Sequence, residues 1–227
     1  MIEIKNLSLK YGGRKVLDDF NLNLDKGKII GLVGENGTGK SSLMRVIAGL
    51  EKNYSGEVLI DGNKPGGKTN ALISYQPDHL PFDDFMTVID IGNIYERFYD
   101  DFDSESYYKM IDSFSIKRSL KIKECSKGMK DKVQIAATLA RKSEIYLLDE
   151  PMTGIDPKAR FEMLNTIIEN FNLESTLIIS THLISEIEKI LDEVIIISDG
   201  KVLAHKAVDE IRAEKGLSLE EYFREVL

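Results

Sequence analysis

Gly34-Glu35-Asn36-Gly37-Thr38-Gly39-Lys40-Ser41 is the stretch of this chain that decides its fold. It matches the phosphate-binding pattern G-x-x-x-x-G-K-[ST] at every fixed position. The run before it, Lys28–Val33, is typical of a short buried strand, and Ser42–Leu50 after it has helical spacing with a glycine near its end. A strand, a glycine loop and a helix N-terminus aim backbone N–H groups and the helix dipole at one point. The stretch therefore predicts a polyphosphate site.

The side chains of this loop complete the predicted site. Lys40 supplies positive charge to the β- and γ-phosphates of a nucleotide, and the hydroxyl of Ser41 suits a Mg²⁺ ion. The predicted nucleotide-binding residues of the loop are Gly34, Glu35, Asn36, Gly37, Thr38, Gly39, Lys40, Ser41 and Ser42.

Composition and charge limit the classes of protein to which the chain can belong. Its 227 residues carry 30 Lys and Arg against 38 Asp and Glu, a net charge of −8, so we expect no nucleic-acid partner. The single cysteine, Cys125, excludes an internal disulfide and fits a reducing compartment. No apolar signal core opens the chain and no apolar run approaches membrane-spanning length. We expect a cytoplasmic protein.

The order of apolar patterns predicts an α/β fold with a mostly parallel sheet. Turn-bounded strand patterns fill the region before the loop and recur at 55–62 and 72–76. From Thr87 to about Leu120 apolar residues recur every three to four positions instead, which predicts an inserted helical region. The second half alternates expected strands with helices; the strands are 145–148, 176–179 and 194–197, and the helices are 128–141, 157–171 and 183–191.

The second chemical motif is an apolar strand that ends in two acids, Ile145–Pro151. A strand that is buried on both faces can place a carboxylate only at its carboxyl end, where open α/β sheets bind ligands. We expect Asp149 to hold Mg²⁺ directly or through water. Glu150 is expected to orient and deprotonate a water that attacks the γ-phosphate.

The order of these motifs resembles the ATPase subunits of ATP-binding cassette (ABC) transporters, from Tyr11 to about Lys206. The resemblance implies ATP and Mg²⁺ as cofactors. It also implies that Tyr11 stacks on adenine with Val16 beside it and that Gln76 senses Mg²⁺ and the γ-phosphate. The inter-subunit loop of the family would end in Asp156, and His182 would contact the γ-phosphate.

The resemblance also implies an architecture. It has a P-loop NTPase core with a mostly parallel sheet, an antiparallel β subdomain at the N-terminal side and an inserted α-helical subdomain. Within a single domain of residues 1–227, the core is expected at about 1–77 and 128–206, the insertion at about 78–127 and a short helical tail at about 207–227.

The signature motif departs from the family pattern. The family usually reads Leu-Ser-Gly-Gly-Gln, whereas Cys125–Met129 reads Cys-Ser-Lys-Gly-Met. Ser126 is a good N-cap for the amphipathic helix that follows. Three lysines stand in its first turns, where each opposes the helix dipole by about 0.3–1 kcal/mol unless an anion arrives: Lys127, Lys130 and Lys132. Such variants resemble the cassettes of Gram-positive-type multidrug, peptide and lantibiotic exporters.

The resemblance implies an ATPase subunit on the cytoplasmic face of the membrane that powers a separate permease. Two copies, or this chain and a related cassette, would close head to tail around two ATP molecules. Ser126 and Gly128 of one subunit would then face the Lys40 loop of the other. Four aromatic residues are candidates for the groove that receives the permease: Phe82, Phe85, Tyr95 and Tyr99.

Two other classes of protein stay open at this point. One is a soluble cassette ATPase that serves iron–sulfur assembly or translation. The other is a non-catalytic nucleotide-binding protein, for which loss of Glu150 or His182 would be expected, and both residues are present.

Overall fold

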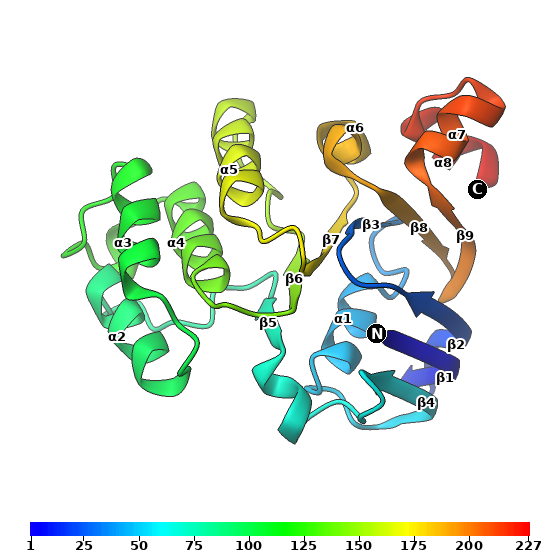
Figure 1. Ribbon diagram of the computed structural model, residues 1–227, viewed down its shortest axis with the longest axis horizontal. Coiled ribbons are helices and arrows are strands. Elements are labelled where there is room, and N and C mark those ends of the chain that lie inside the picture. The colour runs from blue at the N-terminus through cyan, green and yellow to red at the C-terminus, as the bar shows by residue number, and fades with distance from the viewer.

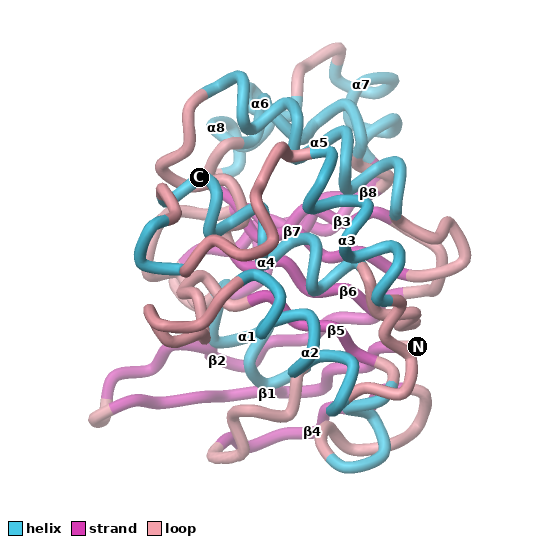
Figure 2. The backbone as a smooth tube through the Cα atoms, turned by 90° about the vertical axis from the view of Figure 1, so that its left-hand side faces the viewer, coloured by secondary structure: helices cyan, strands magenta, loops and turns pink.

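A computed structural model describes all residues, 1–227, and contains two sheets (Figure 1). The larger sheet has six strands in the order β5-β6-β7-β3-β8-β9, and all neighbours are parallel except β8 and β9. Figure 2 shows β5, β6, β7, β3 and β8 stacked in this order, with the three-stranded antiparallel sheet β2-β1-β4 below them. The strands are β1 Ile2–Tyr11, β2 Arg14–Leu24, β3 Ile29–Val33, β4 Tyr54–Ile60, β5 Ile73–Gln76, β6 Ile145–Asp149, β7 Thr176–Thr181, β8 Glu193–Ser198 and β9 Lys201–Ala207.

Helices cover the sheets and form the part of the molecule farthest from the N-terminus, at the left of Figure 1. Helix α1 follows the phosphate-binding loop, and α2 and α3 form the helical insertion with α4 beside them. The helices are α1 Lys40–Ile47, α2 Val88–Phe98, α3 Ser104–Ser113, α4 Lys127–Leu139, α5 Pro157–Asn170, α6 Ile184–Ile187, α7 Val208–Lys215 and α8 Leu219–Val226. None of them is both long and apolar enough to cross a membrane.

The alternation of side chains along the central strands divides the core into two halves. Successive residues of a strand point to opposite faces of the sheet. In β6, Ile145 and Leu147 pack with α1 and the small sheet, whereas Tyr146 and Leu148 pack with the helices of the other face. Because both faces are covered, polar groups of these strands reach a ligand only at the strand ends.

The fold class predicted from the sequence is confirmed, with two local differences. Strand β9 was not expected, because it is an edge strand whose mixed, half-exposed residues give a weak apolar pattern. The helix expected at 183–191 is instead one α-helical turn followed by a 3-10 turn at Glu188–Ile190. It cannot continue, because the chain becomes extended to reach β8, and the Asp192 backbone N–H donates to the carbonyl of Ile29.

Candidate nucleotide-binding site

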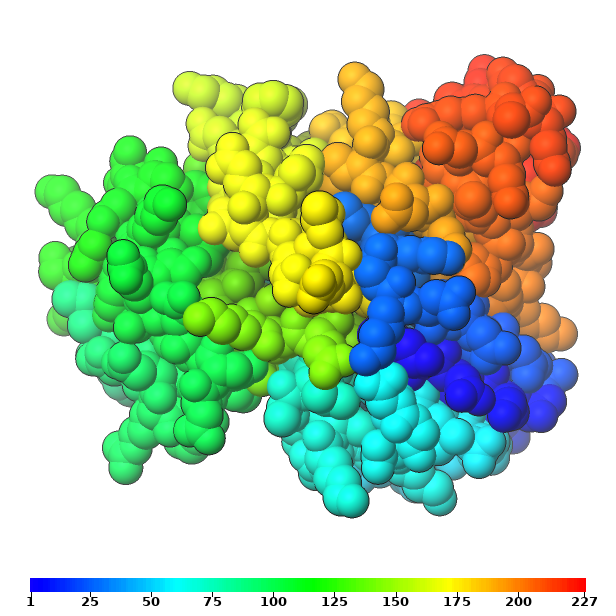
Figure 3. Space-filling view, in the orientation of Figure 1, coloured from blue at the N-terminus to red at the C-terminus, as the bar shows by residue number.

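A cavity of about 370 Å³ opens between the phosphate-binding loop, the start of α1 and the turn between β1 and β2. It gathers nine of the eighteen site residues that the sequence predicts, together with Arg14 and Asp78. Its lining residues are Tyr11, Arg14, Val16, Asn36, Gly37, Gly39, Lys40, Ser41, Ser42, Asp78 and Glu150. In the space-filling view of Figure 3, α5 and the segment after it (yellow) lie between the helical region (green) and the N-terminal strands (blue).

The backbone of the loop can form only with glycine at its end. Gly39 has a φ of 106°, which lies in the left-handed region, and a Cβ there would meet the carbonyl oxygen of Val16 at 2.8 Å. Thr38 fastens the turn because its hydroxyl donates to the carbonyl of Glu35 at 2.9 Å. No side chain caps the N-terminus of α1, so its first N–H groups are free for an anion.

Lys40 lies inside this loop, with only 5% of its surface exposed. Its Nζ donates to the carbonyl oxygens of Gly34 at 2.8 Å and Glu35 at 3.0 Å, and lies 3.5 Å from Oε1 of Glu150. These contacts place a fixed positive charge within the cradle of backbone N–H groups.

Asp149 is the last residue of β6 and is fully buried. Its Oδ1 accepts hydrogen bonds from Ser180 Oγ at 2.6 Å and Ser41 Oγ at 3.0 Å, and its Oδ2 accepts from Tyr75 OH at 3.5 Å. Burial raises the pKa of Asp149, the two serine hydroxyls partly offset this rise, and the negative charges of Asp78 and Glu150 add to it. The carboxylate forms no ion pair within the protein, so hydroxyl groups alone support it.

Glu150 has a φ of 48°, an unfavourable conformation for a residue with a side chain. Its backbone N–H is held by the carbonyl of Ser180 at 3.2 Å and by the hydroxyl of Ser180 at 2.9 Å. Oε2 accepts from Thr153 Oγ1 at 2.8 Å and lies 3.0 Å from Nδ1 of His182. Oε1 is buried without a hydrogen bond and faces Lys40. The turn thus directs to the cavity one carboxylate oxygen that accepts no hydrogen bond.

Two further predicted residues are Gln76, which ends a strand next to the one that carries Asp149, and Tyr11, which lines the cavity. Gln76 ends β5 beside β6 and is 2% exposed, and its Oε1 has no partner. The partly exposed Tyr11 lines the cavity and donates its hydroxyl to Glu51 at 2.9 Å. The pKa of Tyr11 is raised, first by burial and then by this bond.

Nine predicted residues do not line the cavity: Gly34, Glu35, Thr38, Gln76, Asp149, His182, Ser126, Gly128 and Asp156. The last three lie at the N-terminal ends of other helices. Asp156 is the N-cap of α5 and accepts from the N–H of Ala159 at 3.1 Å. Ser126 is the N-cap of α4, as the sequence predicts, and accepts from Met129 N at 3.3 Å. Gly128 is close to Ile155, in the loop that follows Glu150.

The positive charge expected at the start of α4 is largely neutralised within the chain. Lys130 lies 3.6 Å from Asp84, and Lys132 lies 2.6 Å from Glu162. Of the three lysines in the first turns, only Lys127 forms no ion pair.

Several residues that hold the site were not predicted. Arg14 and Asp78 line the cavity, and Thr153 and Ser180 hold Glu150. Ser180 could have been found from the sequence, because it is the next-to-last residue of a buried strand that the parallel sheet places next to β6. Asp78 and Thr153 lie in loops, and Arg14 is the first residue of β2 beside a turn, so no periodic pattern gives their positions.

Comparison with known proteins decides the family. The family model described as "ABC transporter" matches residues 17–153. The chain belongs to the ABC transporter family. The cassette is similar to the ABC transporter ATP-binding protein YtrB of Bacillus subtilis, with 30% identity over 217 residues that cover 94% of this chain and 74% of that protein. It is also similar to the lantibiotic transport ATP-binding protein SrtF of Streptococcus pyogenes, with 31% identity over 219 residues and 92% of each chain covered.

Solved structures agree with this assignment. The ATP-binding subunit of an ABC transporter superposes with a TM-score of 0.86 at 28% identity, over 100% of this chain and 99% of that chain. A dimeric bacterial ABC transporter cassette shares the fold, with a TM-score of 0.79 at 23% identity, over 91% of this chain and 98% of that chain. The cassette is an ATPase that binds and hydrolyses ATP as a subunit of a membrane transporter. The soluble cassette and the non-catalytic binder are not supported.

One prediction concerns the stability of α4. Burial raises the pKa of Asp131 to about 6, and its Oδ2 has no hydrogen-bond partner. The native state therefore binds more protons than the unfolded state between about pH 4 and pH 6, so this group lowers stability as pH rises through that window. Asp131→Asn should raise the free energy of unfolding by about 1 kcal/mol at pH 7.5, since partial exposure reduces the full effect.

Thermal melting of both proteins at pH 4 and pH 7.5 measures this difference. The gain should vanish near pH 4, where the native carboxyl is already neutral. Glu169→Gln, at an exposed helical glutamate, serves as the matched control and should show no such gain. A gain of equal size at both pH values would contradict the prediction.

Proposed function

We propose that this cassette is the motor of an exporter and closes head to tail with a second cassette around two ATP molecules. The observation that carries the proposal is Oε1 of Glu150, which a strained turn holds in the cavity, which accepts no hydrogen bond and which lies 3.5 Å from Lys40 Nζ. A carboxylate in this position can take a proton from a water beside the terminal phosphate. The lantibiotic transport function is that of the relative SrtF and supports the exporter class.

The residues of the cavity divide into three roles. Lys40 and the loop Gly34–Ser42 bind the phosphates. Lys40 places a positive charge where negative charge on the phosphate oxygens increases in the transition state. Tyr11 and Val16 support the adenine ring. Glu150 acts as the base, and His182 fixes its carboxylate at 3.0 Å while its other ring nitrogen is free for the γ-phosphate.

The residues present fit a Mg²⁺ ion. Asp149 is a buried carboxylate that no cation neutralises, and Gln76 Oε1 is a buried oxygen without a partner. With the hydroxyl of Ser41 these are hard oxygen ligands, and Mg²⁺ takes one or two such groups with phosphates and water. Asp149, Gln76 and Ser41 would hold the ion, which would neutralise phosphate charge.

The placement of the signature supports closure with a second cassette. Ser126 and Gly128 do not line the cavity of their own chain, and the start of α4 keeps Lys127 free of ion pairs. A helix N-terminus beside a lysine without an ion pair suits the terminal phosphate of a nucleotide that another subunit binds. Asp156 stands at the end of the loop that would lie between the two subunits. A second copy of this chain or a related cassette would meet the same requirement.

A groove beside the nucleotide cavity is the proposed site for the permease. A cavity of about 810 Å³ lies between the end of β5, α1 and the helical insertion, and Tyr95 and Tyr99 line it together with Leu50. Neither Phe82 nor Phe85 lines the groove, but Phe82 packs against Tyr95 at 6.0 Å between ring centroids. Apolar and aromatic pockets of this kind receive protruding helices. Docking there would keep the cassette at the cytoplasmic face of the membrane.

The first prediction for this function concerns chemistry. Lys40→Ala should lower kcat for ATP hydrolysis at least about a hundredfold. It removes a positive charge whose attraction to the phosphates is stronger in the transition state than in the ground state. Steady-state phosphate release by the purified proteins measures the effect. Lys52→Ala, at an exposed lysine without an ion pair, is the matched control and should keep the wild-type rate. Equal rates for wild type and Lys40→Ala would refute the role.

The second prediction concerns closure. Glu150→Gln keeps the size of the side chain but removes the base, so hydrolysis should fall about 10²–10⁴-fold while ATP binding survives. With ATP uncleaved, a hundredfold excess of nucleotide over its Kd contributes about 2.7 kcal/mol per site to the closed form. Size-exclusion chromatography with light scattering should show a dimer in ATP and a monomer in ADP.

Two serine variants test where the dimer forms. Ser126→Arg in the Glu150→Gln background should abolish the dimer, because it places a large side chain at the start of α4. Ser119→Arg, at an exposed site on the helical insertion, adds the same side chain and should leave the dimer intact. A dimer that survives Ser126→Arg would place the interface elsewhere.

A further inference from the structure

Two segments of the chain hold the carboxylate of Glu150. The loop Thr153–Asp156 reaches it through Thr153 Oγ1 at 2.8 Å. The segment after β7 reaches it through His182 Nδ1 at 3.0 Å. The position of Oε1 in the cavity therefore depends on how these two segments lie relative to one another.

Arg160 joins the two segments. It lies in the first turns of α5, and its side chain extends back toward the N-terminus of the helix, as helical side chains do. Its Nε donates to the carbonyl of Ile155 at 2.8 Å, and its Nη1 donates to Glu186 Oε1 at 3.1 Å. The guanidinium thus bonds the loop on one side and the helical turn of α6 on the other.

The contacts form a closed ring. From Glu150 it passes through Thr153 to Ile155, then through Arg160 to Glu186, and along the α6 segment back to His182 and Glu150. Arg160 is the only member of the ring that contacts both segments and does not contact Glu150 itself. Both bonds are partly shielded, since Arg160 is 19% and Glu186 35% exposed at the side chain.

We propose that Arg160 is a positioning residue, which holds the loop and the α6 segment in register and so fixes the carboxylate of Glu150 for hydrolysis. The inference rests on the proposed role of Glu150 as the base. Arg160 also connects the loop Thr153–Asp156 to the segment that carries His182. A movement of that loop when two cassettes close would therefore also move the carboxylate of Glu150.

The chemistry of arginine explains why this residue occupies the position. Its planar fork makes two hydrogen bonds in fixed directions, whereas the ammonium of a lysine is a point charge on a flexible stem. Arg160→Lys should keep the ion pair with Glu186 or the bond to Ile155, but not the geometry of both.

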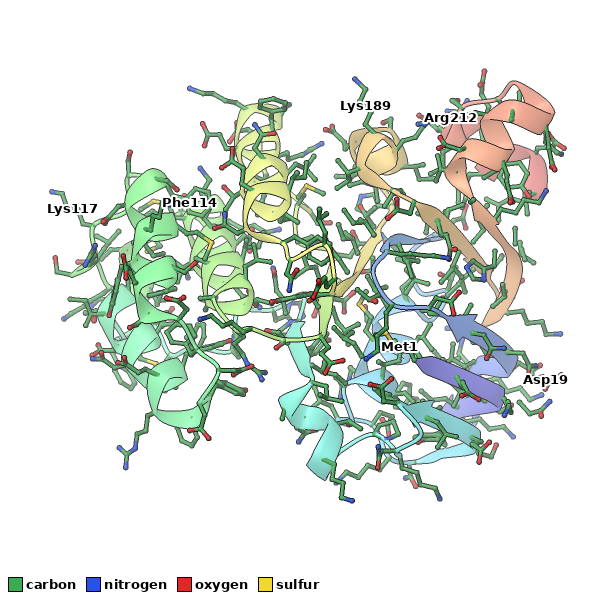
Figure 4. The ribbon with its side chains drawn as sticks, viewed as in Figure 1. Met1, Asp19, Phe114, Lys117, Lys189 and Arg212 are labelled. Atoms are coloured by element: carbon green, nitrogen blue, oxygen red, sulfur yellow. The ribbon has the colours of Figure 1, made fainter.

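A second arginine provides the matched control. Arg212 of α7 bonds Glu188 through Nη2 at 3.1 Å and Nε at 3.4 Å, so it anchors the same segment from the side of the C-terminal tail. Figure 4 labels Arg212 on α7 and Lys189 on the segment after α6. The side chain of Lys189 points away from the protein. Arg212 has no contact with the loop Thr153–Asp156 and is outside the ring.

The experiment compares steady-state ATPase kinetics, nucleotide Kd and thermal melting for Arg160→Gln, Glu186→Gln, their double variant, Arg160→Lys and Arg212→Gln. A small displacement of a catalytic group costs an order of magnitude or more in rate.

Arg160→Gln should lower kcat about tenfold, with KM and Kd for ATP within about twofold of the wild-type values. The double variant should be no slower than the slower single variant, because both changes break one link. Arg160→Lys should recover part of the rate, and Arg212→Gln should keep kcat within about twofold.

Several outcomes would overturn the inference. One is a wild-type kcat in Arg160→Gln, and another is a double variant whose loss of kcat is the product of the two single losses. A third is an equal loss of kcat in Arg212→Gln, which would indicate a general effect on stability. If Arg160→Gln does not fold, Glu186→Gln, which breaks the same link with little change in size, decides alone. Glu150→Gln separates this inference from the proposed function. If Glu150→Gln keeps the wild-type rate, the proposed base is wrong; if only the Arg160 variants keep it, the positioning role is wrong.

Discussion

A buried negative charge at the end of β6 is the constraint on which the site depends. Asp149 is fully buried, and a carboxylate in that place costs several kcal/mol unless other groups support it. Its neighbours are two serine hydroxyls, one from β7 and one from the start of α1, and no cation. The same position joins the sheet to the phosphate-binding loop. The carboxylate therefore ties the two halves of the site together, and no internal cation competes with the proposed Mg²⁺ ion for it.

The adjacent residue shows how the fold uses local strain. Glu150 takes a left-handed backbone conformation, which costs of order 1–3 kcal/mol, and Ser180 holds it there with two hydrogen bonds. Because successive side chains of a strand alternate, a regular strand would send Glu150 away from Asp149 and into the protein. The turn allows both carboxylates to face the ligand edge. One serine thus supports the buried acid and the strained turn beside it.

The sequence was sufficient for the parts of the molecule with strong local patterns. The glycine loop, the buried strand with two acids and the amphipathic helices predicted the fold class, and the structure gathers most of the predicted loop residues in one cavity. It was insufficient where tertiary contacts decide. Strand β9 has a weak apolar pattern because it is an edge strand, and Thr153 contacts Glu150 only because the turn brings it back. The roles of the site residues remain predictions.

The degenerate signature has a physical reading once the ion pairs of α4 are known. Three lysines at a helix start should oppose the dipole, but Lys130 and Lys132 are paired with Asp84 and Glu162. Lys127 replaces the first glycine of the family pattern and lies against Gly154, in the loop that follows Glu150. Its charge is the only one of the three that is left for an anion. A lysine there exchanges the close backbone approach of a glycine for a cation. In the proposed closed form, this cation would contact the phosphate that the helix start faces.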